Sequence, residues 1–230
     1  MKKIGIIGGM SWQSTQEYRK FINEEVARRL GGLNSAEIIE FDVNFAHIDQ
    51  LMRDNDWKTI AEIIVDLSRQ VEAAGADLLV MASNTIHKVA DDVSAAINIP
   101  LVHIGDATGQ AIAHSQISNV GLLGTKATME EDFLKGHLID VYNLEVNIPS
   151  TNLREEIQRI IFDELCQGLT TDASKQVLLD AIEELTSQGS EGVILGCTEL
   201  PLLVQPTDTP ISLFDTTKLH SVTAVDMALV

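Results

Sequence analysis

The chain has 230 residues, of which 45% are hydrophobic and 22% are charged, so it can bury a core as one domain or as two small ones. Its formal net charge of −18 offers no basic surface to neutralise phosphate groups, which argues against nucleic acid as a partner. Gly8 and Gly9 interrupt the N-terminal apolar run before it completes a signal sequence, and no other run has membrane-spanning length. We therefore expect a cytoplasmic protein that binds neither nucleic acid nor membranes.

Apolar periodicity predicts helices that alternate with strands along the chain. In chain order we predict a strand over 4–7, a helix from Ser11, a strand over 36–45, a helix over 57–74 and a strand over 78–81, which runs into a polar turn over 82–85. The last of these strands is a continuous apolar run, typical of a parallel sheet covered on both faces. The alternation predicts an α/β fold with parallel sheets.

The second half of the chain repeats features of the first half. Residues 75–84 align with residues 189–198, which places Ser83 and Cys197 in the same column. Residues 4–8 also align with 120–124, and 100–102 with 210–212. One such match is common between unrelated βα units, but three in the same order indicate two homologous halves. If the two sheets meet at their carboxyl ends, Ser83 and Cys197 face each other across a bound molecule.

Cys197 is the strongest candidate for a catalytic side chain. It follows an apolar strand in the turn Gly196-Cys197-Thr198-Glu199, where we expect backbone donors to lower the pKa of the thiol from about 8.5 toward neutrality. The competing interpretation is a buried small hydrophobe, the usual role of a free cysteine. Cys166 fits that second role, because apolar residues recur at helical spacing beside it. With two cysteines and no secretion signal, both thiols are expected to be reduced.

A second polar group, Ser83-Asn84-Thr85, follows the strand over 78–81. Its hydroxyls and amide suit a carboxylate or an amino group, although such residues often bond only their own backbone. The segment Gly5–Gly9 lacks the G-x-G-x-x-G spacing, so no nicotinamide cofactor is expected. The histidines are too scattered for a metal signature, and no metal is expected.

Four motifs occur in a fixed order over essentially the whole chain. They are Gly8-Gly9-Met10-Ser11-Trp12 with Ser14-Thr15, Asn84-Thr85 with His87, Leu123-Gly124-Thr125 with Thr128-Met129, and Gly196-Cys197-Thr198-Glu199. Together they resemble the aspartate/glutamate racemase family. The resemblance implies two Rossmann-like parallel-sheet domains related by pseudo-twofold symmetry, one formed by 1–99 plus 210–230 and the other by 100–209. It also implies an active site in the cleft between them, an amino-acid substrate, no pyridoxal phosphate or other cofactor, and a homodimer.

The family's usual machinery is a pair of cysteines, one in a C-N-T motif and one in a G-C-T motif, which act on opposite faces of the substrate α-carbon. The second cysteine is Cys197 here, whereas Ser83 occupies the first position. Serine is a far weaker acid than cysteine and makes a poor resting base. The resemblance therefore implies that Cys197 abstracts the α-proton from L-aspartate or L-glutamate and that Ser83 donates a proton to the opposite face.

The same resemblance implies a set of substrate-binding residues: Met10, Met52, Ser83, Asn84, Thr85, Thr198 and Glu199. Met52 stands where relatives are expected to carry a polar group for the side-chain carboxylate, and Arg53 is a nearby candidate for that role. Two alternatives remain open. One is a single-thiol decarboxylase of the same superfamily, in which Cys197 only protonates a carbanion. The other is a catalytically degraded protein that keeps a dicarboxylate-binding cleft.

Overall fold

The computed structural model describes residues 1–230 and divides them into two compact units. The first comprises Met1–His103 with His220–Val230, and the second comprises Ile104–Leu219. Each unit contains a four-stranded parallel sheet, with strand orders β2-β1-β3-β4 and β6-β5-β7-β8. These two orders are the same when each is counted from the first strand of its own unit. The predicted α/β fold with two Rossmann-like units is confirmed, and β3 and β7 are equivalent strands.

The sheet of the first unit is apolar on both faces. Its strands are β1 (Ile4–Gly8), β2 (Ile38–Asp42), β3 (Leu78–Met81) and β4 (Leu101–Val102). Successive side chains of a strand point to opposite faces, so the strands divide their residues between two apolar clusters. One cluster contains Ile7, Leu79 and Met81, and the other contains Ile4, Ile6, Leu78 and Val80. The continuous apolar run of β3 follows from burial on both sides.

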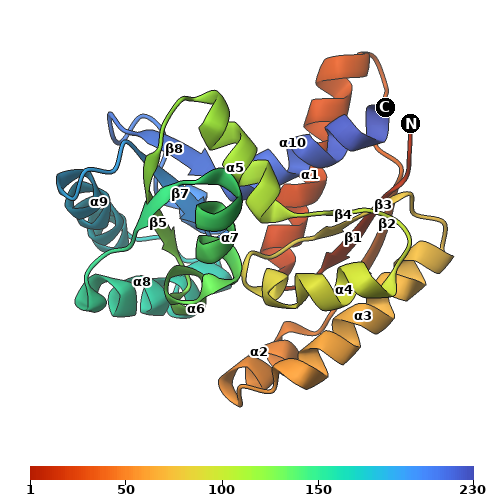
Figure 1. Cartoon of the computed structure of the whole chain (residues 1–230), viewed down its shortest axis with the longest axis horizontal. Helices are drawn as coiled ribbons and strands as arrows, with labels where there is room; N and C mark the ends of the chain where they lie inside the picture. The colour runs from red at the N-terminus through yellow and green to blue at the C-terminus, as the bar shows by residue number, and fades with distance from the viewer. The chain divides into compact units, whose positions relative to one another are not determined.

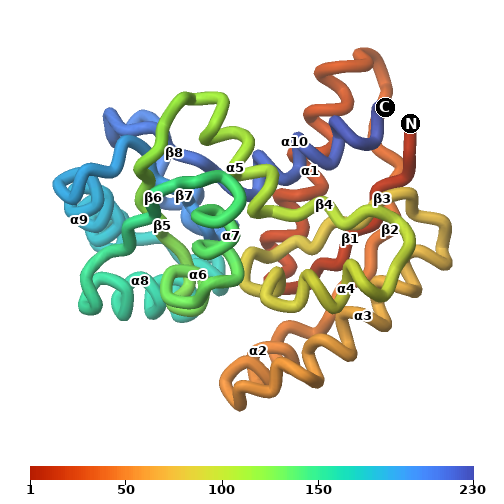
Figure 2. Tube along the Cα trace, viewed as in Figure 1, coloured from red at the N-terminus to blue at the C-terminus, as the bar shows by residue number.

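Helices cover both faces of this sheet (Figure 1). On one face lie α1 (Trp12–Leu30) and the part of α10 (Thr216–Leu229) from His220 onward, and on the other lie α3 (Trp57–Ala73) and α4 (Ala90–Ala96). The unit is completed by α2 (Phe45–Arg53) and the short 3₁₀ helix η1 (Thr85–Val89). The two termini lie side by side (Figure 2), and the Lys2 amide donates a hydrogen bond to the Ala228 carbonyl at 2.8 Å.

The second unit is built on the same plan. Its strands are β5 (Asn119–Gly124), β6 (Glu145–Asn147), β7 (Gly192–Gly196) and β8 (Ser212–Asp215). Its helices are α5 (Ile104–His114), α6 (Lys126–Glu130), α7 (Asp132–Tyr142), α8 (Thr151–Asp163) and α9 (Asp172–Ser187), with 3₁₀ turns η2 (Leu165–Gln167) and η3 (Leu200–Leu202). One apolar cluster joins the sheet to these helices. No helix in either unit is both long enough and apolar enough to cross a membrane.

One predicted element, the strand over 36–45, is longer than the strand in the structure. The strand β2 ends at Asp42, and Phe45 is the first residue of α2. The reason is local, because the Asn44 side chain caps α2 by accepting a hydrogen bond from the Ala46 amide at 3.2 Å. The apolar residue Phe45 therefore belongs to helix α2, although the apolar pattern places it in the predicted strand.

Candidate active site

In the first unit, the last residue of β1 and the residue after it are glycines at positions that do not suit a side chain. A Cβ atom added to Gly8 would lie 2.4 Å from Asp42 Oδ1, and Gly9 has a φ of +84°. The Gly9 amide donates to Thr15 Oγ1 at 2.8 Å. Ser11 then caps α1, since its side chain accepts from the Ser14 amide at 3.3 Å. The glycines and the cap together fix the path from β1 into α1.

The turn Ser83-Asn84-Thr85 follows β3, which pairs with β1 in parallel. The Ser83 amide donates to the Met81 carbonyl at 2.8 Å, and the Ser83 carbonyl accepts from Nδ1 of the buried His87 at 2.8 Å. Both backbone groups of Ser83 are therefore held, while its side chain is half-buried. Because the carboxyl ends of parallel neighbours lie at one edge of a sheet, this turn lies at the same edge as Met10.

The C-terminal end of α2 carries two further residues that the sequence singled out. Met52 is half-buried and packs against the apolar cluster that contains Met10. Arg53, in contrast, is exposed to solvent: 67% of its side chain is accessible. Its Nε lies 2.9 Å from Asp49 Oδ2, one helical turn away. The charge of Arg53 is therefore balanced within α2 by Asp49.

In the second unit, β5 and β7 end side by side, with Gly124 opposite Gly196. A Cβ on Gly124 would lie 2.9 Å from the Gly196 carbonyl oxygen, and one on Gly196 would lie 2.9 Å from the Leu123 carbonyl oxygen. Cγ2 of Thr128 lies 3.0 Å and 3.2 Å from the same two hypothetical atoms. These glycines allow Thr128 to pack directly on the backbone that precedes Cys197.

The Cys197 thiol is buried and donates a hydrogen bond to Glu199 Oε2 at 2.9 Å. The hydroxyl of Thr198 donates to the same oxygen at 2.7 Å. Glu199 itself is only 4% exposed, so a carboxylate with two local donors lies beside the sulfur in a buried position. The structure thus brings together three of the residues that the sequence singled out.

The expectation of a lowered thiol pKa is wrong for this structure. Burial raises the pKa of Cys197 well above its ordinary value, and electrostatic interactions with Glu199 and Cys166 act in the same direction. A backbone hydrogen bond with Glu199 opposes them, but it is the weakest of these influences. The thiol is therefore the proton donor of the pair, and Glu199 is the acceptor.

The two units use the same device at the carboxyl end of their first strand. Ser11 caps α1 through the Ser14 amide, and Thr125 caps α6 through the Thr128 amide at 3.2 Å. The paired hydroxyls are also in contact, at 3.3 Å in the first unit and 2.9 Å in the second. Sequence reasoning missed this repeat, although a hydroxyl residue three positions before another, directly after a strand, was visible in both halves.

Comparisons with known proteins agree over nearly the whole chain. Residues 7–224 match the family described as Asp/Glu/Hydantoin racemase. A candidate Asp/Glu racemase from Yersinia pestis is 44% identical over all of both chains, with a TM-score of 0.94. An aspartate racemase homologue from Pyrococcus horikoshii OT3 is 37% identical over all of both chains, with a TM-score of 0.86. The broad specificity amino-acid racemase RacX of Bacillus subtilis is 22% identical over 92% of each chain.

Proposed function

Because the chain belongs to the Asp/Glu/hydantoin racemase family, we propose that it interconverts the L- and D-enantiomers of aspartate, of glutamate or of both, without pyridoxal phosphate. The observation that carries this proposal is the buried pair of Cys197 and Glu199, in which the thiol Sγ donates a hydrogen bond to Glu199 Oε2 at 2.9 Å just after β7. A racemase needs a group that can both remove and return a proton at carbon, and a thiol next to a carboxylate suits that task.

The substrate that we propose is a small acidic amino acid. A chain with a net charge of −18 repels a dicarboxylate at long range, so recognition depends on local donors. We assign the amide of Asn84 and the hydroxyl of Thr85 as hydrogen-bond donors to the α-carboxylate, and the Thr198 hydroxyl oxygen, whose proton is given to Glu199, as an acceptor for the α-ammonium group. Met10 and Met52, which pack in one apolar cluster of the first unit, are the apolar residues that we assign to the substrate site. Arg53 is a weaker candidate for the side-chain carboxylate, since it already pairs with Asp49.

In the proposed reaction Cys197 removes the α-proton of the L-enantiomer. The thiol must first lose its own proton, and Glu199 Oε2 is the acceptor that the hydrogen bond provides. The α-ammonium group of the substrate adds a positive charge, which favours the thiolate. The thiolate then takes the α-proton, which restores the thiol and leaves a carbanion on the substrate. In this direction, the proton that leaves carbon is thus held by sulfur.

Ser83 completes the reaction in this proposal by donating its hydroxyl proton to the opposite face of the carbanion. A hydroxyl is a much weaker acid than a thiol, so this step is slow. The proton that Glu199 received from the thiol must then return through water to the Ser83 alkoxide, which restores the starting state. The equivalence of β3 and β7 in the two sheets supports the assignment, because Ser83 and Cys197 follow equivalent strands. We also propose that the enzyme acts as a cytoplasmic homodimer, as the family resemblance implies.

Incubation with a panel of L- and D-amino acids in heavy water tests the proposed function. The α-proton is followed by NMR and the chirality of the product by chiral chromatography, with a 5-substituted hydantoin included because the family description names hydantoins. We expect exchange and inversion with aspartate or glutamate. Release of carbon dioxide from an α-substituted malonate without inversion of amino acids would instead identify a decarboxylase. Thermal stabilisation by a dicarboxylate without exchange would identify a binding protein.

A further inference from the structure

We propose that α8 positions the Cys197 turn, with Gln158 and Arg154 acting as positioning residues through the short helix α6. The proposal rests on the proposed function, because it gives α6 a part in that reaction. Neither residue belongs to a motif of the family resemblance, and neither touches Cys197 in any contact described above. Their effect is carried by α6, which lies between α8 and the end of β7.

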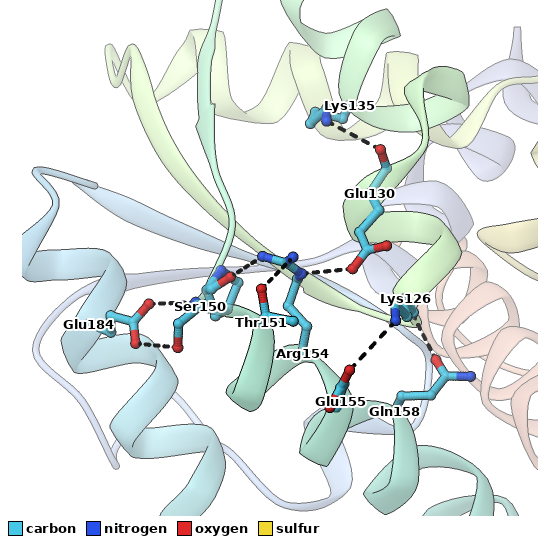
Figure 3. Close-up of polar contacts among 10 residues, drawn as sticks. Lys126, Glu130, Lys135, Ser150, Thr151, Arg154, Glu155, Gln158 and Glu184 are labelled. Carbon is cyan, nitrogen blue, oxygen red and sulfur yellow. Dashed lines mark hydrogen bonds and ion pairs between the residues drawn. The ribbon is translucent and has the colours of Figure 1, made fainter.

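The helix α6 has only five residues, Lys126–Glu130, and is too short to be stable by itself. Its N-terminal end is held by two bonds. The Lys126 amide donates to Gln158 Oε1 at 2.7 Å, and the Thr128 amide donates to Thr125 Oγ1 at 3.2 Å (Figure 3 shows the first of these contacts). Gln158 thus supplies from α8 an acceptor for an amide that the helix itself leaves without one.

The C-terminal end of α6 is held by Arg154, whose side chain is 17% exposed. Its guanidinium donates to Glu130 Oε1 at 2.8 Å, to the Pro149 carbonyl at 2.6 Å and to Thr151 Oγ1 at 3.2 Å (Figure 3). The contacts with Pro149 and Thr151 fix the guanidinium at the start of α8, so Glu130 is bound to a group that is itself held. Both ends of α6 are therefore tied to α8.

Thr128 connects α6 to the Cys197 turn. It lies in the middle of α6 and is fully buried. Its Cγ2 lies 3.2 Å from the place of a Cβ on Gly196, the residue that precedes Cys197 in the chain. Thr128 therefore occupies the space that a Cβ on Gly196 would need, and a retreat of α6 would open a void beside Gly196. By this geometry, Gln158 and Arg154 hold α6 in place, and α6 in turn keeps the Cys197 thiol buried.

The side chain of Arg159, also on α8, provides a matched control. Its guanidinium pairs with Glu156 at 2.7 Å and with Glu164 at 2.9 Å, and its side chain is 45% exposed. These contacts stay within α8 and the turn that follows it and do not reach α6. Replacement of Arg159 removes ion pairs from the same helix without loosening α6, which separates positioning from a general loss of charge.

The test compares Gln158→Met and Arg154→Met with two rescue variants, Gln158→Glu and Arg154→Lys, and with the control Arg159→Met. Gln158→Glu keeps an acceptor for the Lys126 amide, and Arg154→Lys keeps a cation for Glu130. All variants carry Cys166→Ala, so that iodoacetamide reports Cys197 alone. Folding is checked by circular dichroism and thermal unfolding, and the alkylation rate is measured against pH beside the rate of α-proton exchange.

We expect Gln158→Met and Arg154→Met to alkylate about fivefold faster at neutral pH and to exchange the α-proton about fivefold more slowly with little change in KM. This factor corresponds to the one hydrogen bond through which each residue holds α6. The rescue variants and Arg159→Met should match the parent. Parent-like alkylation in folded Gln158→Met would overturn the positioning role, and this variant carries the test if Arg154→Met does not fold. If the parent exchanges the α-proton of none of the amino acids tested, the proposed function is overturned instead. The alkylation rates still decide the positioning role in that case.

Discussion

The Sγ atom of Cys197 lies 2.9 Å from Oε2 of Glu199, two residues further along the chain. The carboxylate oxygen accepts and the thiol donates, so the shared proton is bonded to sulfur before a substrate binds. This arrangement separates two functions that the sequence assigned to Cys197 alone. Sulfur is the atom that meets the substrate carbon in the proposed reaction, and Glu199 takes the proton that must leave sulfur first.

Replacement of Cys197 by alanine should abolish exchange of the α-proton. The substitution removes the proposed base, and a positioned acid–base group typically contributes about 10²–10⁴-fold to the rate. Exchange is measured by NMR in heavy water, and circular dichroism verifies that the variant is folded. Cys166→Ala is the matched control: it deletes the other thiol, which packs against the core from η2, and should leave the rate of exchange nearly unchanged. Full activity of Cys197→Ala would show that another residue is the base.

Replacement of Glu199 by glutamine should lower the pKa of Cys197. Burial is the largest cause of the raised pKa and remains in the variant, but the negative charge of Glu199 is the second cause and is removed. The pH profile of alkylation, recorded with Cys166→Ala present, should therefore move to lower pH while exchange at neutral pH falls, because the proton acceptor is lost. An unchanged profile would mean that Glu199 does not influence the thiol.

Ser83→Cys should increase racemisation, most visibly in kcat measured from the D-enantiomer, since kcat/KM must rise equally in both directions. The substitution restores a thiol at the position where the family usually has one, and a stronger acid speeds the slow proton transfer by roughly tenfold or more. Chiral chromatography measures the initial rates from both enantiomers. Ser83→Ala serves as the control that removes the hydroxyl without adding a thiol. A lower rate in Ser83→Cys than in the parent would show that the site is adapted to the hydroxyl.

The buried His220 should make the first unit sensitive to acid. Its Nε2 donates to the Val102 carbonyl at 2.7 Å, so Nδ1 accepts from the Tyr18 hydroxyl at 2.8 Å and the ring is neutral. Burial lowers the pKa of His220 to about 4, against an ordinary value of 6.5. Since the pKa in the folded state lies below that in the unfolded state, the stabilisation is fully present above pH 6.5 and is lost as the pH falls toward 4.

This loss amounts to roughly 3 kcal/mol of unfolding free energy, taken from a shift of that size. Urea unfolding at a series of pH values should show that His220→Gln flattens the dependence over this range relative to the parent. The exposed His114 provides the control, because His114→Gln should keep the parent's dependence. Curves for His220→Gln that run parallel to those of the parent would contradict the assignment.

Strands and half-repeats of this chain could be predicted because they depend on local patterns. The run Leu78–Met81 is apolar throughout and is a buried strand as predicted. The strand expected over 36–45 extends beyond the observed strand, because a single capping residue, Asn44, decides where the next helix begins. Composition around residue 44 gives little warning of that change, whereas the helix from Trp57 follows a clear apolar stripe.

The electrostatics of the candidate site could not be predicted in the same way. The sequence shows that Glu199 lies two residues from Cys197, but not that its side chain folds back beside the sulfur in a buried position. Burial of that pair reverses the direction of the pKa shift. The supports of α6 are still less visible, because Gln158 and Arg154 lie 32 and 24 residues along the chain from the groups that they bind. Only folding brings such residues together.

The ratio of α-proton exchange to inversion, measured separately from each enantiomer in heavy water, tests the central claim most directly. Free L- and D-amino acids are equally stable, so kcat/KM must match for the two directions, and the asymmetry between Cys197 and Ser83 has to appear in this ratio. A carbanion formed by Cys197 from the L-enantiomer is often reprotonated by the same thiol, after the thiol has exchanged with solvent, before Ser83 delivers its proton. We predict that the L-enantiomer loses its α-proton faster than it inverts, whereas the D-enantiomer inverts nearly every time it exchanges. Equal ratios from the two enantiomers, with exchange of the thiol proton verified, would contradict the assignment of Cys197 as the strong base and Ser83 as the weak partner.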